Sequence, residues 1–311
     1  MRLIFLGTPD FAVPTLERML DAGFEVPLVV TQADRPKGRG QSLAAPPVKQ
    51  AAQRLGLPVY QPERIRRPEA IARLSAIAAD GMVVVGYGQI IPQAVIDLAP
   101  RGIINVHASL LPKYRGAAPI QWAIVNGDIR TGVTTMRIDA GLDTGDMLLR
   151  AETPIGPEEN AVDLGKRLAL LGADILVETM RGLGAGVLTP QKQDHAQATL
   201  APILKKEDGL IDWRLSAHAI HNRVRGFQPW PGAYTTFRGQ TLHIWESRPV
   251  AAEPLVPPGV FESRKPLIVA CGGSALELRT VQLEGRKRIA AADFANGQRL
   301  TDNDRIGDTH R

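Results

Sequence analysis

The segment NVHAS, which begins at Asn105, alternates polar and apolar residues at the end of the apolar run GIINVH. Side chains two positions apart on a strand point to the same face of a sheet, so Asn105 and His107 are expected to converge on one small volume. An asparagine amide donates hydrogen bonds to an oxygen that gains negative charge, and a histidine transfers protons near neutral pH. The pair therefore predicts attack on a carbonyl group. The simpler interpretation is a histidine held in a turn by hydrogen bonds.

Three aspartates lie further along, in the glycine-rich stretch IDAGLDTGDM: Asp139, Asp143 and Asp146. A carboxylate close to His107 would favour the protonated imidazole and orient the ring. Aspartates beside glycines also commonly cap turns. The pattern alone leaves open which of the three reaches His107.

Several other chemistries are disfavoured because their motifs are absent. The turn GTPDFAVP follows a strand and opens a helix, but it has neither the GxGxxG spacing of dinucleotide sites nor the GxxxxGK[ST] pattern of a P-loop. GxSxG is absent, which argues against a serine hydrolase. His, Asp and Glu show no recognisable ligand spacing, and Cys271 is the only cysteine, so we expect neither a metal site nor a disulfide.

Short apolar runs alternate with helical patterns through the first half of the chain. Apolar strands that alternate with helices indicate a mostly parallel, Rossmann-like sheet covered on both faces. Ligands of such sheets bind outside the carboxyl ends of the strands, which is where Asn105 and His107 lie. The expected strands are RLIFLG, EVPLVVT, LPVYQ, MVVVG, GIINVH, TTMRID and DMLLRAE.

The composition changes after the long helical pattern that ends near residue 181. Residues 1–185 are predicted to form the catalytic domain, and residues 186–206, rich in Gly, Gln, Thr and Pro, to form a linker. Residues 207–311 contain one helical pattern and then short alternating runs with Gly and Pro turns. These runs indicate a small antiparallel barrel or sandwich. The polar tail after Asp293 is expected to fray.

The charge is distributed unevenly. The whole chain has a net charge of +5, whereas the segment from Asp34 to Arg67 holds eight Lys or Arg residues against Asp34 and Glu63, a local net charge of +6. Such an excess suggests a polyanionic partner, although a solvated surface would show it too. No run of about 18 apolar residues occurs, so we expect no membrane span, and MRLIFLG is interpreted as a first buried strand. A reducing cytoplasm fits a chain with a single cysteine, and we expect a monomer.

A family resemblance becomes visible when the motifs are taken together. NVHASLLPKYRGAAPIQ with GLDTGD resembles the formyltransferases that use 10-formyltetrahydrofolate as donor. The resemblance extends through FLGTPDFAVPTLERML, TQADRPKGRG, VVVGYGQIIP and RGFQPWPGAYTTF, so it covers nearly the whole chain. GTPDFAVP and DRPKGRG favour the members that act on initiator methionyl-tRNA. The implied fold is a Rossmann-like formyltransferase domain followed by a small OB-like β-barrel that binds tRNA.

The resemblance also implies roles for individual residues. Asn105, His107 and Asp143 would be the catalytic trio. The folate would contact the SLLP turn and the backbone of VGYG, that is, Ser109, Leu110, Leu111, Pro112, Val85, Gly86, Tyr87 and Gly88. The tRNA would contact two basic groups, Arg35, Lys37 and Arg39 in the first domain and Arg286, Lys287 and Arg288 in the second. Gly86 is a departure, since an alanine is expected there.

The implied mechanism needs no metal. The methionyl amine would attack the formyl carbon of 10-formyltetrahydrofolate, while Asn105, joined by His107, donates to the developing oxyanion. Asp143 would keep His107 charged and help to relay the proton to the leaving nitrogen. The alternatives are a different acceptor amine (glycinamide ribonucleotide or a nucleotide-linked amino sugar), a formyl-donor hydrolase or dehydrogenase, and a non-enzymatic RNA-binding protein. The basic loop argues against a different acceptor amine. We expect no reductase domain, which argues against the hydrolase or dehydrogenase, and the intact trio argues against a non-enzymatic protein.

Overall fold

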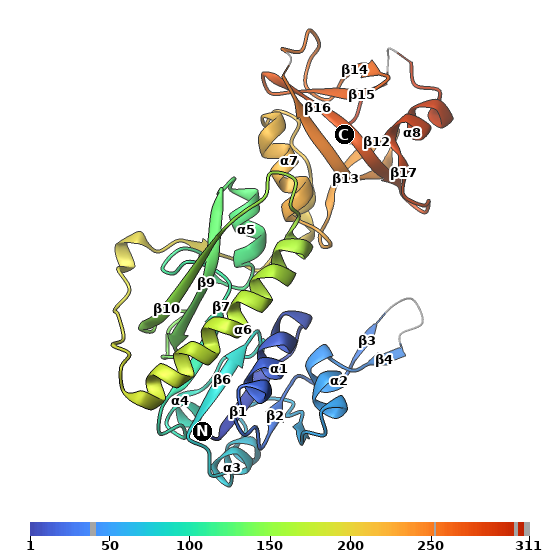
Figure 1. Ribbon diagram of the computed structural model, residues 1–311. Coiled ribbons are helices and arrows are strands. Elements are labelled where there is room, and N and C mark those ends of the chain that lie inside the picture. Colours follow the sequence, from blue (N-terminus) through green and yellow to red (C-terminus); the bar gives the residue numbers. More distant parts are fainter. Residues whose placement is uncertain (38–41, 252, 302–303, 308–311) are drawn as a thin grey trace. The chain divides into compact units, whose positions relative to one another are not determined.

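The computed structural model describes residues 1–37, 42–251, 253–301 and 304–307 of the 311-residue chain (Figure 1). The chain divides into two compact units, each described by itself. The first comprises residues 1–119, 130–154 and 165–201, and the second residues 120–129, 155–164 and 202–311. Within the described residues, no helix is long and apolar enough to cross a membrane.

The first unit is built on a seven-stranded sheet with the order β10-β9-β7-β6-β1-β2-β5. Neighbours from β5 to β7 run parallel, and β9 and β10 are added antiparallel. The prediction of a mostly parallel, Rossmann-like sheet is thus confirmed. The strands are β1 (Leu3–Gly7), β2 (Val29–Val30), β5 (Val59–Tyr60), β6 (Gly81–Val85), β7 (Ile103–His107), β9 (Arg130–Arg137) and β10 (Met147–Pro154).

Helices begin and end where backbone chemistry requires. Pro14, Pro47 and Pro68 each lie in the first turn of a helix, where a missing N–H removes no helical hydrogen bond. Gly23 and Gly56 follow α1 and α2 with φ of 82° and 68°, which a glycine adopts without strain. The helices of this half of the chain are α1 (Val13–Asp21), α2 (Pro47–Arg54), α3 (Pro68–Ser75), α4 (Gln93–Ile96), α5 (Pro119–Val125) and α6 (Ala161–Ala185).

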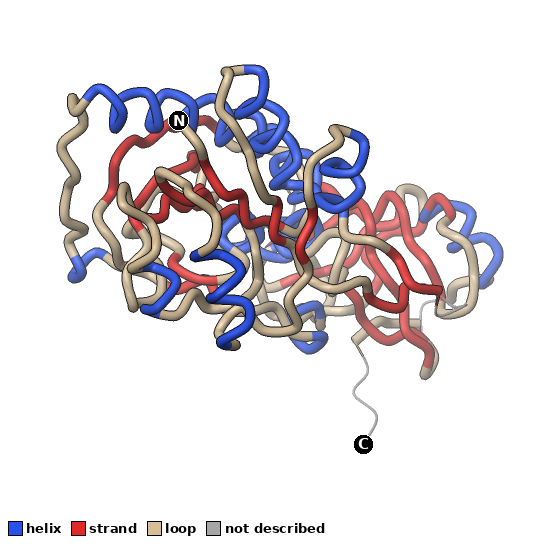
Figure 2. The backbone as a smooth tube through the Cα atoms, turned by 90° about the horizontal axis from the view of Figure 1, so that it is seen from below, coloured by secondary structure: helices blue, strands red, loops and turns tan. Residues whose placement is uncertain are grey.

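The two faces of the sheet are covered by different helices, as Figures 1 and 2 show. Leu74 of α3 and Val95 of α4 pack in one apolar cluster with Ile103 of β7. On the other face, Val106 of β7 lies against α6 at Gly172, where an added Cβ would stand 2.8 Å from a Val106 methyl carbon. Because side chains alternate along a strand, Asn105 and His107 face away from α6.

The chain that follows α6 belongs to the first unit as far as residue 201. Residue 191 forms an antiparallel bridge with Met147, the first residue of β10. Further on, β11 (Leu200–Ala201) pairs in parallel with β8 (Arg115–Gly116), directly after the turn that follows β7. The domain bounds predicted from the sequence, with a linker at 186–206, stay predictions. Residues 193–201 nevertheless contact the segment that follows His107.

The second unit is rich in antiparallel strands, as predicted. The sheet order is β12-β13-β16-β15-β14, with β17 paired to β16. Its two edges are joined by residues 305 and 306, because Ile306 bridges Phe237 of β12 and Arg305 bridges Val260 beside β14. The strands are β12 (Ala233–Phe237), β13 (Gln240–Val250), β14 (Phe261–Arg264), β15 (Leu267–Cys271), β16 (Ser274–Leu283) and β17 (Ile289–Ala290).

Two helices cover the core of this unit. In α7 (Ala217–Gly226), the Ser216 side chain accepts a hydrogen bond from Ala219 N, which caps the helix. In α8 (Ala291–Gln298), Phe294 is 2% exposed and packs in the same cluster as Ile306. The tail after Asp293 was expected to fray, and for the described residues to 307 that expectation is wrong, because apolar side chains anchor it.

Candidate active site

Strand β7 places Asn105 and His107 on one face, at the carboxyl end of the parallel part of the sheet. Asn105 is 9% exposed and His107 is 5% exposed. The Asn105 amide makes no hydrogen bond to any described residue, yet it keeps a small accessible surface. A nearly buried amide without a partner destabilises the fold unless a ligand or water forms hydrogen bonds with it. This side chain is therefore available to a bound molecule.

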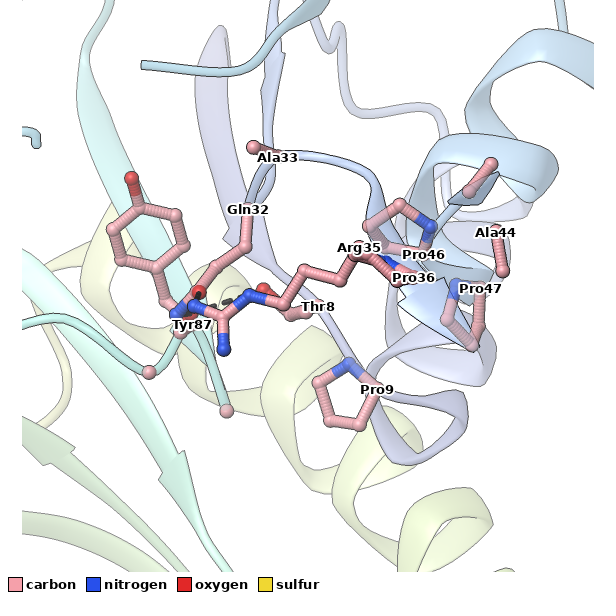
Figure 3. A pocket seen from close by; sticks show the side chains of 13 residues that line it. Thr8, Pro9, Gln32, Ala33, Arg35, Pro36, Ala44, Pro46, Pro47 and Tyr87 are labelled. Carbon is pink, nitrogen blue, oxygen red and sulfur yellow. Dashed lines mark hydrogen bonds between the residues drawn. The ribbon is translucent and has the colours of Figure 1, made fainter. Parts of the chain in front are cut away.

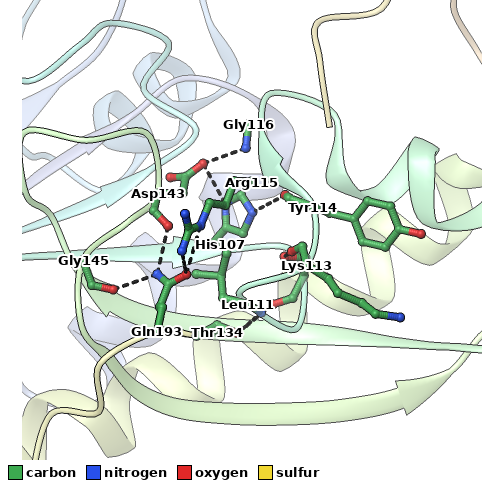
Figure 4. Close-up of polar contacts among 11 residues, drawn as sticks. His107, Leu111, Lys113, Tyr114, Arg115, Gly116, Thr134, Asp143, Gly145 and Gln193 are labelled. Atoms are coloured by element: carbon green, nitrogen blue, oxygen red, sulfur yellow. Dashed lines mark hydrogen bonds and ion pairs between the residues drawn. The ribbon is translucent and has the colours of Figure 1, made fainter. Parts of the chain in front are cut away.

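The contacts of His107 define its protonation pattern (Figure 4). Nε2 lies 2.9 Å from the carbonyl oxygen of Tyr114. A carbonyl can only accept, so Nε2 carries the proton and, in the neutral ring, Nδ1 is the free base. Nδ1 faces the Asp143 carboxylate with Oδ2 at 3.6 Å, which is longer than a hydrogen bond. Nδ1 thus stays free to accept a proton beside a carboxylate that would stabilise the imidazolium.

Of the three aspartates that the sequence left as candidates, Asp143 is the one beside His107. Asp143 has φ of 51°, and its Oδ2 also accepts a hydrogen bond of 2.8 Å from Gly116 N. Asp139 instead caps its own turn, because its Oδ1 accepts from Gly141 N and Thr144 Oγ1. The backbone carbonyl of Asp146 accepts from Arg137 N at the start of β10. The structure therefore brings Asn105, His107 and Asp143 to the same face of β7.

Sequence reasoning did not single out the residues that hold this arrangement. The Tyr114 carbonyl orients His107, the Gly116 N–H holds Asp143, and the Gln193 amide contacts the backbone of the Asp143 turn. Gln193 is 5% exposed although it lies in a segment that reads as a polar linker. The one available signal was a glutamine between Lys192 and Asp194, which is too weak to indicate burial.

The SLLP turn that follows β7 is held mainly from within. Ser109 Oγ donates to Lys113 O at 2.6 Å, and Thr134 Oγ1 both donates to Ser109 O and accepts from Leu111 N. The side chains of Ser109 and Leu111 are fully buried, whereas Leu110 and Pro112 are half-buried. Any ligand at this turn would therefore meet Leu110, Pro112 or backbone, and would not reach the hydroxyl of Ser109.

Of the stretch from Val85 to Gly88, residues 86–88 border a cavity of about 500 Å³ (Figure 3). Val85 is fully buried at the end of β6, while Gly86 and Gly88 have φ of 55° and 81°. The Tyr87 ring points away from the cavity into the apolar cluster of α3 and α4, and its carbonyl accepts hydrogen bonds from Thr8 Oγ1 and Gln32 Nε2. Only backbone and glycine are presented here. Residues 109–112 do not line this cavity.

The opposite wall of the cavity comes from the basic segment. Arg35 begins a short hairpin, β3 (Arg35–Lys37) and β4 (Ser42–Ala44), and its guanidinium donates to Gln32 Oε1. Hydrogen bonds from Gln61 and then Lys49 hold the pKa of Asp34, at the root of the hairpin, below its usual value. Lys37 lies in β3, and Arg39 lies outside the described residues.

The second predicted basic group follows β16 in the other unit. Arg286, Lys287 and Arg288 are all exposed. The Arg288 guanidinium carbon lies 3.4 Å from the centroid of the Trp245 ring, so this cation is stacked on an aromatic face. His243 stacks on Trp245 as well, with centroids 5.8 Å apart. Arg288 is thus held in place, while Arg286 and Lys287 extend into solvent.

The described residues contain no group of three or more His, Cys, Asp or Glu side chains placed to hold a metal ion. The polar groups that converge at β7 are instead an unpartnered amide, an imidazole and a carboxylate. Such a set can stabilise an oxyanion and move a proton at a carbonyl centre.

Comparison with known proteins places the chain in a family. The model described as "Formyl transferase" matches residues 1–180, and "Formyl transferase, C-terminal domain" matches residues 203–299. The chain is 71% identical over 310 residues to a methionyl-tRNA formyltransferase of Solibacter usitatus (strain Ellin6076), with 100% of both chains covered. It is 60% identical to that of Koribacter versatilis (strain Ellin345), with 99% of each covered.

Among solved structures, the fold is similar to that of WlaRD, a sugar 3N-formyl transferase. The TM-score is 0.69 at 19% identity, and the match covers 92% of this chain and 99% of the other. At that identity the likeness concerns the fold alone. The two family models and the full-length relatives establish that the chain belongs to the formyl transferase family.

Proposed function

We propose that the chain transfers the formyl group of 10-formyltetrahydrofolate to the free amino group of initiator methionyl-tRNA, giving N-formylmethionyl-tRNA for the start of translation. The relatives that are 71% and 60% identical over the full length bear the name of this activity. The observation that carries the proposal is the convergence of Asn105, His107 and Asp143 at the end of β7. These groups suit acyl transfer from one nitrogen to another.

Asn105 is assigned to the oxyanion. 10-Formyltetrahydrofolate supplies a formyl group on an aniline-like nitrogen, a better leaving group than an ordinary amide nitrogen. The Asn105 amide has no partner among the described residues, so it can donate to the formyl oxygen as that oxygen gains negative charge. The backbone that carries this amide is fixed in a buried strand, which keeps the donor at the end of β7.

His107 is assigned to proton transfer, with Asp143 as its counter-ion. The Tyr114 carbonyl keeps the proton of the neutral ring on Nε2, so Nδ1 accepts the proton of the attacking amine. The Asp143 carboxylate, 3.6 Å from Nδ1, stabilises the resulting imidazolium. The same proton then moves to the leaving nitrogen, so no net proton is gained or lost at the pair.

The folate is assigned to the backbone of residues 85–88 and to the SLLP turn. Gly86 and Gly88 have no side chains to obstruct a planar ring, and the Tyr87 side chain is directed into the core. Ser109 and Leu111 shape the turn from within, and Leu110 and Pro112 present its accessible surface. These residues fit a flat heterocycle whose polar edge can form hydrogen bonds with backbone groups.

The tRNA is assigned to the two basic groups. Arg35 and Lys37 lie in β3 of the first unit, where Arg35 lines the cavity. Arg39 follows them in the sequence, outside the described residues. Arg286, Lys287 and Arg288 present three cations on the second unit. Lys and Arg contacts to phosphates supply most of the sequence-independent affinity for nucleic acid.

The test of the proposed function is an acceptor comparison with 10-formyltetrahydrofolate as donor. Methionyl-tRNA, glycinamide ribonucleotide and a dTDP-linked amino sugar are supplied in parallel, with uncharged tRNA as the control. We expect formylation of methionyl-tRNA at a kcat/KM at least about 100-fold above that of either small acceptor. Preferred formylation of a small acceptor would contradict the proposal, as would binding of tRNA without any turnover.

The proposal extends to the state of the enzyme in the cell. We place it in the cytoplasm, where charged tRNA and folates meet, and expect it to act as a monomer. Light scattering at micromolar concentration measures the mass directly, and a mass near twice 33.6 kDa would contradict the monomer.

A further inference from the structure

We propose that Gln193 is a positioning residue for Asp143, acting through the backbone of the 143–145 turn. This inference rests on the proposed function. Gln193 lies fifty residues beyond Asp143 in the sequence, in the segment between α6 and β11. It is 5% exposed, and both ends of its amide are occupied.

The orientation of the Gln193 amide follows from its partners (Figure 4). The Arg115 guanidinium donates from Nε and from one terminal nitrogen to Gln193 Oε1, at 3.1 and 2.7 Å. Arginine has no acceptor, so the oxygen must face Arg115 and the NH₂ group must face the other way. Nε2 then donates to the carbonyl oxygens of Asp143 and Gly145, at 2.8 and 2.7 Å. In this orientation, every one of these four hydrogen bonds joins an N–H donor to an oxygen acceptor.

Holding two carbonyls with one NH₂ group fixes the shape of the turn between them. Asp143 has φ of 51°, a left-handed conformation that is uncommon outside glycine, although aspartate adopts it more readily than most residues. Gly145 lies so close to the Arg137 carbonyl that an added Cβ would overlap it. With the backbone held at both positions, the Asp143 side chain can leave the turn in few directions. The direction it takes brings Oδ2 to His107.

Arg115 connects this support to the second anchor of Asp143. Arg115 is 7% exposed, and among the described residues its guanidinium contacts Gln193 and His195 but no carboxylate. A buried cation of this kind strengthens the hydrogen bonds beyond it by polarising the amide. The next residue, Gly116, donates its N–H to Asp143 Oδ2. Both residues of β8 therefore support Asp143. Gly116 binds its carboxylate directly, and Arg115 supports its backbone through Gln193.

The variant that isolates this role is Gln193→Glu. The carboxylate keeps the size of the side chain and still accepts from Arg115, but it presents an oxygen to two carbonyl oxygens. The turn must move away from that repulsion. The matched control is Gln191→Glu, which makes the same chemical change on an exposed side chain two residues earlier.

Steady-state formylation of methionyl-tRNA is measured from pH 6 to 9 for wild type, both variants, Asp143→Asn and the Gln193→Glu/Asp143→Asn double variant. We expect Gln193→Glu to lower kcat roughly 10- to 100-fold, with KM for both substrates within about 3-fold, because displacing a catalytic group by about 1 Å has effects of this size. Its pH–rate profile should shift in the limb that Asp143→Asn changes. Gln191→Glu should match wild type.

The double variant separates positioning from general support of the fold. If Gln193 acts through Asp143, adding Gln193→Glu to Asp143→Asn should cost less than about 3-fold more. An equal loss in both backgrounds, or a wild-type kcat and profile for Gln193→Glu, would overturn the inference. Circular dichroism and a Gln193→Met variant monitor folding, and loss of the fold in both variants would also overturn it. A wild-type chain that does not formylate methionyl-tRNA would contradict the proposed function instead.

Discussion

At the scale of single residues, the site depends on which polar atoms have partners. The Asn105 amide has none among the described residues, His107 Nε2 is bound to a carbonyl, and Asp143 Oδ2 is bound to a backbone N–H. The partners of His107 and Asp143 fix the positions of those side chains. The Asn105 amide has no such partner and is available to a ligand. This division is what a site needs if one group is to meet developing charge and the others are to hold a proton.

Asn105→Ala should remove the oxyanion donor without disturbing the fold, since the amide supports no other described residue. We expect kcat to fall roughly 100- to 1000-fold, about 3 kcal/mol or more, with tRNA affinity nearly unchanged. Rapid-quench formylation and filter binding measure the two quantities. A variant that kept more than about a third of the wild-type kcat would exclude Asn105 as the donor.

Tyr87 gives a residue-scale prediction about pH. Its hydroxyl is buried without a partner among the described residues, and burial raises the pKa of Tyr87 from 10.0 to about 12. The folded chain therefore holds this proton more tightly than the unfolded chain, so its contribution to stability is complete below pH 10 and is lost as the pH rises from 10 to 12. Tyr87→Phe should reduce the decrease in the free energy of unfolding between pH 10 and pH 12, measured by urea unfolding.

In Tyr87→Phe, part of the loss of stability at alkaline pH should remain. Burial also raises the pKa of the Cys271 thiol to about 12, so this second group still destabilises the folded chain as the pH rises. At neutral pH, removing an unsatisfied hydroxyl should leave stability unchanged or raise it by about 1 kcal/mol. The KM for folate should not change. A loss of stability above about 2 kcal/mol would mean that the hydroxyl has a partner.

At the scale of elements, the short pairing of β8 with β11 is what brings residues near 193 to the end of β7. The pairing requires Gly116, which has φ of 121° and would place a Cβ 2.6 Å from the carbonyl oxygen of Ala201. No flexible side chain is available to move aside. The contact is between backbone segments, and it supports the N–H that holds Asp143.

Gly116→Ala should therefore lower both stability and rate. We expect a loss of about 2 kcal/mol or more in the free energy of unfolding from strain and overlap, together with a fall in kcat as the contact with Asp143 loosens. Gly23→Ala is the control, because Gly23 has φ of 82° but open space around it. It should lose about 1 kcal/mol and keep the wild-type kcat. Equal effects of the two substitutions on kcat would contradict the role of β8.

The elements themselves were largely predictable from the sequence, because strands and helices follow periodicity, proline and glycine. The two-residue period also placed Asn105 and His107 on one face. The supports of the site were not predictable: Gln193 meets Asp143 across fifty residues, and the Tyr114 contact is made by a backbone atom. The helix α8 was missed because its eight residues include only one large apolar side chain, Phe294, together with Gly297. Tertiary packing outweighs that weak pattern.

At the scale of the whole molecule, the two units carry different chemistry, and the proposed function has both of them contact the tRNA substrate. The first unit holds the buried polar trio, and the second presents exposed cations on an antiparallel sheet. Stacking on Trp245 limits the freedom of Arg288, so less entropy is lost when it meets a phosphate. The second unit is thus expected to contribute to affinity for tRNA and not to the chemical step.

Arg288→Ala should weaken tRNA binding and reduce the slope of log K against log salt by about 1, as expected for one lost phosphate contact. Arg279→Ala, which removes an exposed cation from β16, is the equal-charge control and should change the slope less. The KM for folate should stay within about 3-fold in both. An unchanged slope for Arg288→Ala would remove Arg288 from the tRNA surface.

Single-turnover formylation of methionyl-tRNA by wild type and His107→Ala, with tRNA affinity measured on the same preparations, separates chemistry from binding. General acid–base groups contribute about 10²- to 10⁴-fold, so the formylation rate should fall at least about 100-fold while the Kd for charged tRNA stays within about 3-fold. A His107→Ala variant that formylates methionyl-tRNA at a near-normal single-turnover rate would contradict the assignment of the active site to the end of β7.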